Sequence, residues 1–158
     1  MEKINYSIKE AKEFSEEERN RFKEIVLSKG EVSEESFDGL MNKNPILLFY
    51  PNTKEIEAIG ALKIPHDSYK NKVFKKSGTT LDPDDYKYEL GWIVSLVEKK
   101  GNGALITKIL HDHTSRIYST VRKENIGMNK IINRTGFQKV GEAYKSTRGN
   151  YYNFLYIK

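Results

Sequence analysis

The stretch between residues 90 and 110 constrains the fold of this chain more than any other. An apolar run, LGWIVSLV at residues 90–97, breaks into EKKGNG, and a segment with apolar residues at helical spacing follows: Leu105, Ile106, Ile109 and Leu110. The pattern predicts a buried strand, a glycine loop and a helix over about 103–113. Helix amides in the first turn lack internal partners and attract anions, and glycine lets the backbone approach them closely. The stretch therefore predicts either an anion site or a tight connection that binds nothing.

Length and composition favour one globular domain over residues 1–158. The chain has 37% hydrophobic and 31% charged residues, and no apolar run approaches the roughly 20 residues that span a bilayer. Its first residues, MEKINYSIKEAKEF, have no apolar core, so we expect a cytoplasmic protein with no membrane partner. The absence of cysteine excludes disulfides, thiolate nucleophiles and Cys-ligated zinc.

The charge is distributed unevenly along the chain. Residues 99–158 contain 12 Lys and Arg against 3 Asp and Glu, whereas residues 1–98 contain 15 against 19. The C-terminal part is therefore expected to face an anion such as a polyphosphate cofactor, a nucleic acid or a membrane surface. A solvated basic surface without a partner is the alternative.

Periodicity and capping signals predict seven strands and about four helices, in an α/β fold with a mixed, mostly antiparallel sheet. Ser15 and Glu18 form a capping-box pattern before a helix over about 16–29. The other expected helices follow Ser33, the glycine loop and Asn125, and the expected strands cover residues 3–8, 46–50, 56–64, 86–97, 117–121, 137–144 and 151–157. Residues 65–85 are polar and lack sustained periodicity, which predicts a loop that either contacts substrate or is disordered in solvent.

Three motifs in order resemble the GNAT superfamily, the acyl-CoA-dependent N-acyltransferases. KGNGAL at 100–105 is similar to the family's Gln/Arg-x-x-Gly-x-Gly/Ala loop, with Gly103 on the essential glycine. In the second, Asn125-x-x-Met128 is similar to Asn-x-x-Ala, and Thr135-Gly136-Phe137 resembles the common Leu-Gly-Phe. The third is Gln138-Lys139-Val140-Gly141-Glu142, which resembles the strand after that turn, typically Phe-x-x-x-Gly. The resemblance covers about residues 89–142. Lys100 and Leu105 depart from the pattern, since the family has Arg or Gln and then a small residue there.

The resemblance implies a single domain with splayed central strands that binds acetyl-CoA. It places the pyrophosphate on the amides of Lys100, Gly101, Asn102, Gly103 and Ala104. It places the pantetheine arm on the backbone of Ser95, Leu96 and Val97, with the oxyanion donor near Ser95 or Leu96. Asn125 corresponds to an asparagine that contacts the cofactor, although an ordinary helix N-cap explains it equally well.

The implied activity is direct transfer of the acetyl group to an amine of a small molecule or a protein. Glu89 lies where many members place a carboxylate base. Many members also place a tyrosine acid on the helix before the Gly-Phe turn, but Ile132 occupies that position here. The thiolate proton would then come from Tyr118, from Tyr88 or from water; alternatively the step needs no acid, or catalysis is impaired. Tyr144 and Tyr151 are candidate walls for the acceptor.

Two other functions stay open at this point. Ile132 motivates a non-catalytic acyl-CoA-binding module, and the basic, tyrosine-rich C-terminal part motivates binding or modification of nucleic acid. His111 and His113 lie two residues apart on a helix and would point to different sides, so we expect no metal site. His66 is either a substrate contact or a surface histidine, and a homodimer through the C-terminal strands is compatible with the pattern.

Overall fold

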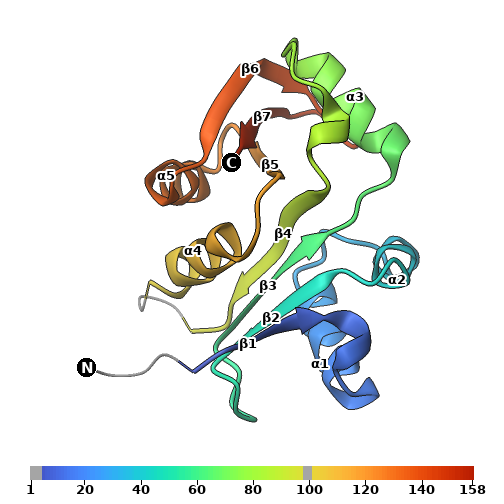
Figure 1. The fold of residues 1–158 in the computed structure, drawn as a ribbon, viewed down its shortest axis with the longest axis vertical. Coiled ribbons are helices and arrows are strands. Elements are labelled where there is room, and N and C mark those ends of the chain that lie inside the picture. The colour runs from blue at the N-terminus through green and yellow to red at the C-terminus, as the bar shows by residue number, and fades with distance from the viewer. Residues whose placement is uncertain (1–4, 98–100) are drawn as a thin grey trace. The chain divides into compact units, whose positions relative to one another are not determined.

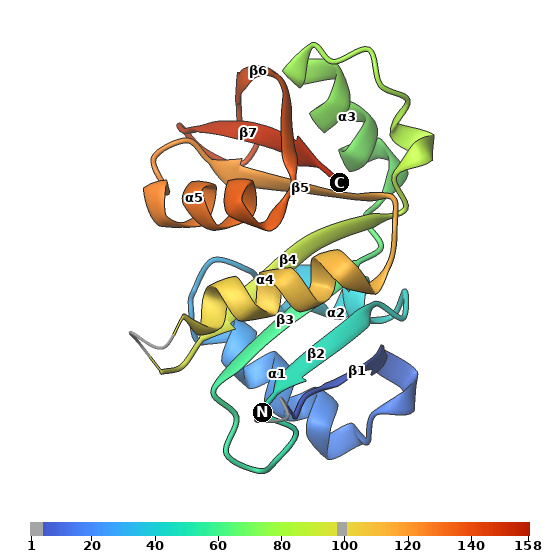
Figure 2. The same ribbon diagram turned by 60° about the vertical axis from the view of Figure 1, so that its left-hand side comes forward.

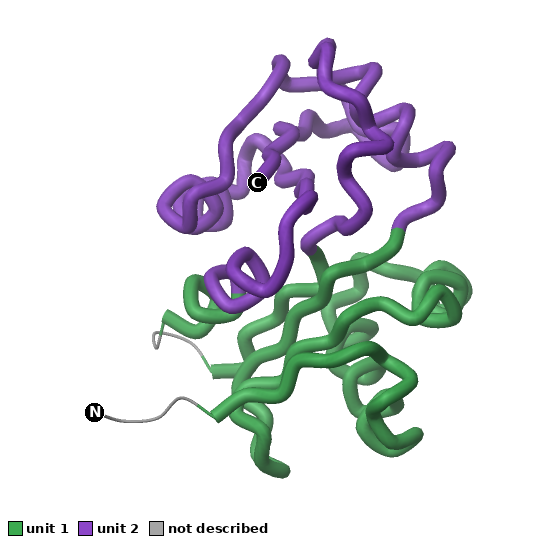
Figure 3. Tube along the Cα trace, in the orientation of Figure 1, with its two compact units in different colours: residues 1–64, 91–106 green, residues 65–90, 107–158 purple. Residues whose placement is uncertain are grey.

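The computed structural model describes residues 5–97 and 101–158. Its backbone divides into two compact units (Figure 3): residues 1–64 and 91–106 form unit 1, and residues 65–90 and 107–158 form unit 2. The single domain expected over 1–158 stays a prediction.

Across the described residues, seven strands follow one another in the hydrogen-bonded order β1-β2-β3-β4-β5-β7-β6 (Figure 1). Their bounds are β1 (Ser7–Glu10), β2 (Ile46–Tyr50), β3 (Ala58–Lys63), β4 (Tyr88–Ser95), β5 (Ile117–Arg122), β6 (Gln138–Lys145) and β7 (Tyr152–Ile157). β4 and β5 run parallel, whereas β1 with β2, β2 with β3, β5 with β7 and β6 with β7 run antiparallel. The expected α/β fold with a mixed, mostly antiparallel sheet is confirmed.

Five α-helices occur in the described part of the chain, one more than expected. They are α1 (Glu16–Leu27), α2 (Glu34–Met41), α3 (Asp67–Ser77), α4 (Asn102–His113) and α5 (Ile126–Thr135), with 3-10 turns η1 (Ala11–Glu13) and η2 (Pro83–Asp85). The capping box of α1 is confirmed: Glu18 N–H donates to Ser15 Oγ at 3.1 Å, and Ser15 N–H donates to Glu18 Oε1 at 2.9 Å. None of these helices is long and apolar enough to cross a membrane.

Helix α3 corrects the prediction of a loop over residues 65–85. Four buried residues recur at helical spacing on it, but two of them are polar: Lys70, Val73, Phe74 and Ser77. Lys70 packs its aliphatic stem inward and donates from Nζ to the Tyr86 carbonyl at 3.0 Å. Ser77 Oγ donates to the Phe74 carbonyl at 2.8 Å. The inward face of the helix therefore looks polar in the sequence although it is buried.

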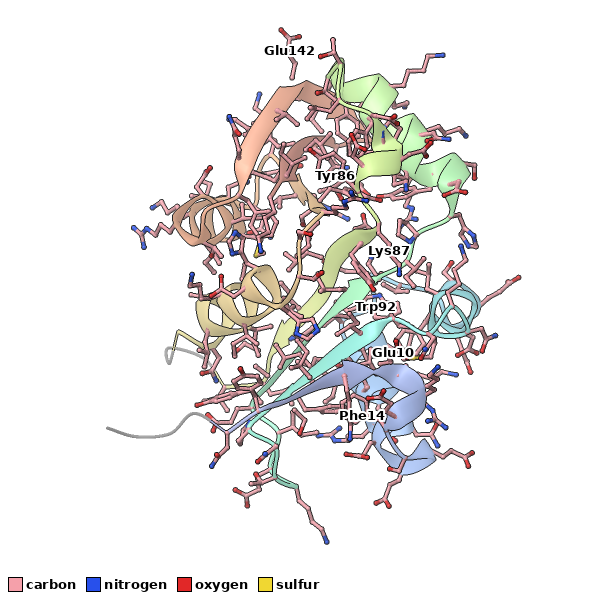
Figure 4. The ribbon with its side chains drawn as sticks, viewed as in Figure 1. Glu10, Phe14, Tyr86, Lys87, Trp92 and Glu142 are labelled. Atoms are coloured by element: carbon pink, nitrogen blue, oxygen red, sulfur yellow. The ribbon has the colours of Figure 1, made fainter. Side chains whose placement is uncertain are left out.

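In unit 1, α1 and α2 cover one face of the β1–β2–β3 strands (Figure 2), and aromatic rings fill the space between them. Trp92 of β4 points toward α2 (Figure 4), with its ring centroid 4.6 Å from that of Phe37 and 5.9 Å from that of Phe22. The backbone of Trp92 has φ +52°, which is rare for a bulky residue and costs about 1–3 kcal/mol. Ring packing holds this strained backbone in place.

In unit 2, α3 and α5 lie on opposite faces of the β5–β7–β6 strands (Figure 2). Alternate residues of the strands serve the two faces, as strand geometry requires. Tyr118 and Leu155 pack with Phe74 of α3, whereas the hydroxyl of Tyr156 donates to Asn129 Oδ1 of α5 at 2.6 Å. Both faces of this part of the sheet are therefore covered.

Gly141 marks the closest approach of β6 to α3. Its φ is +66°, and the register of β6 with β7 shifts between Val140 and Tyr144. A Cβ built on Gly141 would overlap the carbonyl oxygen of Ser77 and lie 2.9 Å from its carbonyl carbon. Both the backbone angle and the space therefore require glycine here.

Candidate functional site

The glycine loop of unit 1 enters α4 through Gly101. Gly101 has φ +68°, a conformation that other residues rarely adopt, and its carbonyl accepts the N–H of Leu105 at 3.1 Å. The helix begins at Asn102, so the expected succession of strand, glycine loop and helix is confirmed. Lys100 lies outside the described residues.

Asn102 brings a buried amide group to the first turn of α4. Its side chain is only 5% exposed, and Nδ2 has no hydrogen-bond partner among the described residues. A buried donor without a partner costs about 1–3 kcal/mol, so such a group calls for a polar ligand or water. Gly103 and Ala104 continue the same turn. A first turn with an additional amide donor suits a phosphate oxygen.

The end of β4 has hydrogen bonds of its own. Ser95 Oγ donates to the Val97 carbonyl at 2.8 Å, and the Leu96 N–H donates to the Glu57 carbonyl at 2.7 Å. The Leu96 amide is therefore used inside unit 1.

Glu89 is buried in unit 2. It is 5% exposed and stands beside Tyr118 in the parallel register of β4 with β5. The hydroxyl of Tyr69, from α3, donates to Glu89 Oε2 at 3.3 Å. Since a charge is not buried without polar partners, this position is unlike an ordinary surface carboxylate at a strand end.

Three tyrosines interact electrostatically with the Glu89 carboxylate: Tyr69, Tyr118 and Tyr144. Burial raises the pKa of each phenol, and the Glu89 carboxylate raises each pKa further. The three phenols therefore stay protonated well above neutral pH. The hydroxyls of Tyr118 and Tyr144 are buried and have no hydrogen-bond partner among the described residues. Asn153, the cross-strand neighbour of Tyr144, lies near its hydroxyl without completing a hydrogen bond.

Two arginines of unit 2 lie over aromatic rings near these tyrosines. The guanidinium of Arg148, in the turn between β6 and β7, lies 4.8 Å from the ring centroid of Tyr69. The guanidinium of Arg122 lies 3.8 Å from the ring centroid of Tyr151. Arg148 also lowers the pKa of Tyr69 and Tyr118 slightly against the larger effects of burial and Glu89.

Sequence reasoning did not find Tyr69 or Arg148. Tyr69 falls in the segment interpreted as a loop, and the spacing of the four buried residues of α3 is the signal that could have placed it on a helix. Arg148 meets Tyr69 only through the fold. Tyr118 and Tyr144, which the sequence did single out, both contribute to the packed cluster of unit 2.

The remaining candidates have local roles. Asn125 caps α5, accepting the Met128 N–H at Oδ1 at 3.1 Å, so its N-cap role is confirmed and cofactor contact stays a prediction. Ile132 is fully buried in α5. His66 is exposed at the N-cap position of α3 and makes no side-chain cap. His111 pairs with Asp112 at 2.8 Å, and no group of three His, Asp or Glu side chains in the described residues is arranged to hold a metal ion.

Comparison with known proteins finds similarity in structure alone. No protein-family model matches the chain, and no curated protein matches its sequence. The structure is similar to NAA60 of Arabidopsis thaliana in complex with acetyl-CoA (TM-score 0.66, 11% identity, covering 98% of each chain). It is also similar to a Bacillus subtilis acetyltransferase in complex with CoA (TM-score 0.59, 12% identity, 99% of each chain). A GNAT-family acetyltransferase of Bacillus cereus has a TM-score of 0.60 at 13% identity, covering 96% of this chain and 94% of that one.

Proposed function

Because this chain has the fold of the GNAT acetyltransferases, we propose that it transfers the acetyl group of acetyl-CoA to an amine. The observation that carries the proposal is the structural likeness to GNAT acetyltransferases over nearly the whole chain. Two of the similar structures are complexes with acetyl-CoA or CoA. At such low identity the likeness concerns the fold, so the roles of individual residues rest on their own surroundings.

The loop before α4 is the proposed site for the coenzyme A pyrophosphate. Gly101 supplies a left-handed turn that only glycine adopts easily, and the first turn of α4 directs amides toward an anion. The partnerless Nδ2 of Asn102 adds one donor. Lys100 would add a positive charge. The groups present therefore fit a phosphate ligand. The pantetheine arm would lie along Ser95 to Val97, where the Leu96 N–H and the Val97 carbonyl already have partners within the chain.

Glu89 is the proposed base. Acetyl-CoA supplies a thioester whose carbonyl carbon the amine attacks, so a C–N bond forms as the C–S bond breaks. An alkylamine has a pKa near that of lysine, roughly 10.4, and must lose a proton to react. Glu89 would accept that proton, directly or through water, and Tyr69 holds the carboxylate in place through its hydroxyl.

Tyr118 is proposed to act as a hydrogen-bond donor. A thiol ionises near pH 8.5, roughly, which is below the raised pKa of Tyr118. Complete proton transfer from this phenol to a thiolate is therefore unfavourable in free energy, but the phenol can still donate a hydrogen bond to the leaving sulfur. We expect water to supply the thiolate proton.

A non-catalytic acyl-CoA-binding module is the second candidate. Ile132 favours it, because the residue is completely buried and cannot donate a proton where many members of the superfamily have a tyrosine. Such a module would bind acetyl-CoA but would not transfer its acetyl group to an amine.

Thermal unfolding with and without acetyl-CoA tests the cofactor site, because a ligand that binds only the folded protein raises its melting temperature. No shift at millimolar acetyl-CoA would contradict both candidates. Thiol release with a panel of amines then separates an enzyme from a binder.

A glutamate pair tests the proposed base. We expect Glu89→Gln to slow turnover on the order of 10²–10⁴-fold with acetyl-CoA affinity unchanged. Glu142→Gln is the matched control, because Glu142 is exposed on β6 (Figure 4) and should leave the rate unchanged. A wild-type rate in Glu89→Gln would remove Glu89 as the base.

A further inference from the structure

In unit 2 one tyrosine side chain contacts both a buried carboxylate and an exposed guanidinium. Tyr69 donates from its hydroxyl to Glu89 at 3.3 Å, and its ring lies beneath Arg148, whose guanidinium is 4.8 Å from the ring centroid. We propose that the acceptor is an amine that also carries an anionic group, with the amine received at Glu89 and the anion bound by Arg148. This inference rests on the proposed acetyltransferase function and names its substrate class.

The oxygens around Glu89 are suited to receive N–H donors. Glu89 is an acceptor when ionised, and each phenol hydroxyl of Tyr118 and Tyr144 offers acceptor lone pairs as well as one donor. Both hydroxyls are buried without a hydrogen-bond partner among the described residues. An ammonium or amine group carries two or three N–H donors, so it can donate to both hydroxyls. Tyr118 can still donate its own proton elsewhere.

The guanidinium of Arg148 is suited to receive an anion. Arg148 is exposed, and its contact with the ring of Tyr69 restricts the orientation of the guanidinium. Guanidinium forks bind carboxylate and phosphate groups through paired hydrogen bonds. In the proposed arrangement a ligand with its amine at Glu89 places its anionic group at this cation.

A second arginine strengthens the preference for an anion. Arg122 of β5 is paired with Asn153 of β7, which is paired in turn with Tyr144 of β6. Residues paired in this way share one face of a sheet, with neighbouring strands about 4.8 Å apart. Arg122 therefore lies on the same face as Tyr144. Two guanidinium groups repel an acceptor with a second ammonium group, which disfavours polyamines and favours acids.

Binding of matched probes to the whole protein, without acetyl-CoA, tests this inference. Each pair contains an acid and the amine that lacks its anion: β-alanine with ethylamine, 4-aminobutyrate with propylamine, and 2-aminoethylphosphonate with ethylamine. We expect the acid of at least one pair to raise the melting temperature of the protein while the simple amine does not. The carboxylate and phosphonate probes distinguish the two kinds of anion.

Arginine variants show whether the preference comes from Arg148. We expect Arg148→Gln to weaken binding of the acid about threefold to tenfold, as for an exposed or bidentate ion pair, and Arg148→Lys to restore part of it. Arg134→Gln removes the same charge from an exposed position of α5, and this variant should bind the acid as tightly as the wild type does. Equal stabilisation by both members of every pair, stabilisation by none, or equal loss in both Gln variants would overturn the inference.

This assay is independent of the cofactor. If acetyl-CoA fails to bind but the acid binds in an Arg148-dependent way, the acetyltransferase proposal fails and the acid site stands. If acetyl-CoA binds and amines are acetylated without preference for acids, the acid site fails and the acetyltransferase proposal stands.

Discussion

Replacing Gly141 with alanine should separate the two reasons for a glycine at the approach of β6 to α3. The backbone at Gly141 has φ +66°, so any Cβ adds strain, and the carbonyl of Ser77 occupies the space that the Cβ needs. Gly78 offers a matched control in the same unit. It has φ +78° at the end of α3, but a Cβ there meets nothing within 4 Å.

The structure gives the expected size of each effect. A left-handed backbone costs an L-residue about 1–2 kcal/mol, which is the whole penalty at Gly78. At Gly141 the new methyl group also meets backbone atoms that cannot rotate away, and such overpacking adds about 1–3 kcal/mol. Alanine restricts the unfolded chain more than glycine and returns about 0.4–1 kcal/mol in both variants. Gly141→Ala should therefore be less stable than Gly78→Ala by about 1–3 kcal/mol.

Thermal unfolding and amide hydrogen exchange measure this difference. The melting temperature should fall by about 2–4 °C per kcal/mol for a chain of this size. Exchange should accelerate most for the amides of α3 and β6, because these elements meet at Gly141. Equal destabilisation of the two variants would refute the close approach and leave only the backbone angle as the reason for glycine.

Three further predictions concern single features. Asn102→Ala should weaken acetyl-CoA binding about tenfold in a thermal-shift titration. The free protein should be as stable as the wild type or more stable, because the substitution removes a buried donor without a partner among the described residues. Unchanged affinity would place the anion elsewhere. Ser15→Ala should lower the free energy of unfolding of unit 1 by about 1 kcal/mol in urea, and an unchanged midpoint would contradict the capping box. The raised pKa values of Tyr69, Tyr118 and Tyr144 stabilise the folded state below the ordinary tyrosine pKa of about 10, and this stability is lost as pH rises beyond it. Phenolate absorbance should show three tyrosines ionising only on alkaline unfolding, and gradual ionisation of all ten tyrosines in the folded protein would contradict it.

The sequence predicted elements whose inward residues are apolar or whose ends carry capping groups. α1 with Ser15 and α5 with Asn125 belong to this class, and their boundaries lie within a few residues of those expected. α3 was missed because Lys70 and Ser77 occupy inward positions, and their burial depends on backbone acceptors that a sequence does not display.

The candidate site divides in the same way. The glycine loop is contiguous, so its residues could be recognised together and Gly101 was among them. The surroundings of Glu89 are assembled from α3, β5, β6 and the turn before β7, and only the fold brings Tyr69 and Arg148 to each other. The prediction of Glu89 came from family resemblance, whereas its burial and its partner Tyr69 could come only from the structure.

Trp92 is a position where local preference and packing disagree. Its backbone angle suits glycine or asparagine, but its ring is the side chain that meets Phe22 and Phe37. The backbone angle and the ring packing favour different residues at this position. The effects of substitutions at Trp92 and at its ring neighbours on the free energy of unfolding should therefore be non-additive, because the strain is tolerated only while the rings are present. Sequence drift at this point of β4 would therefore proceed through coordinated changes in the aromatic cluster, because a single substitution of Trp92 by glycine would relieve the backbone but leave a hole among the rings.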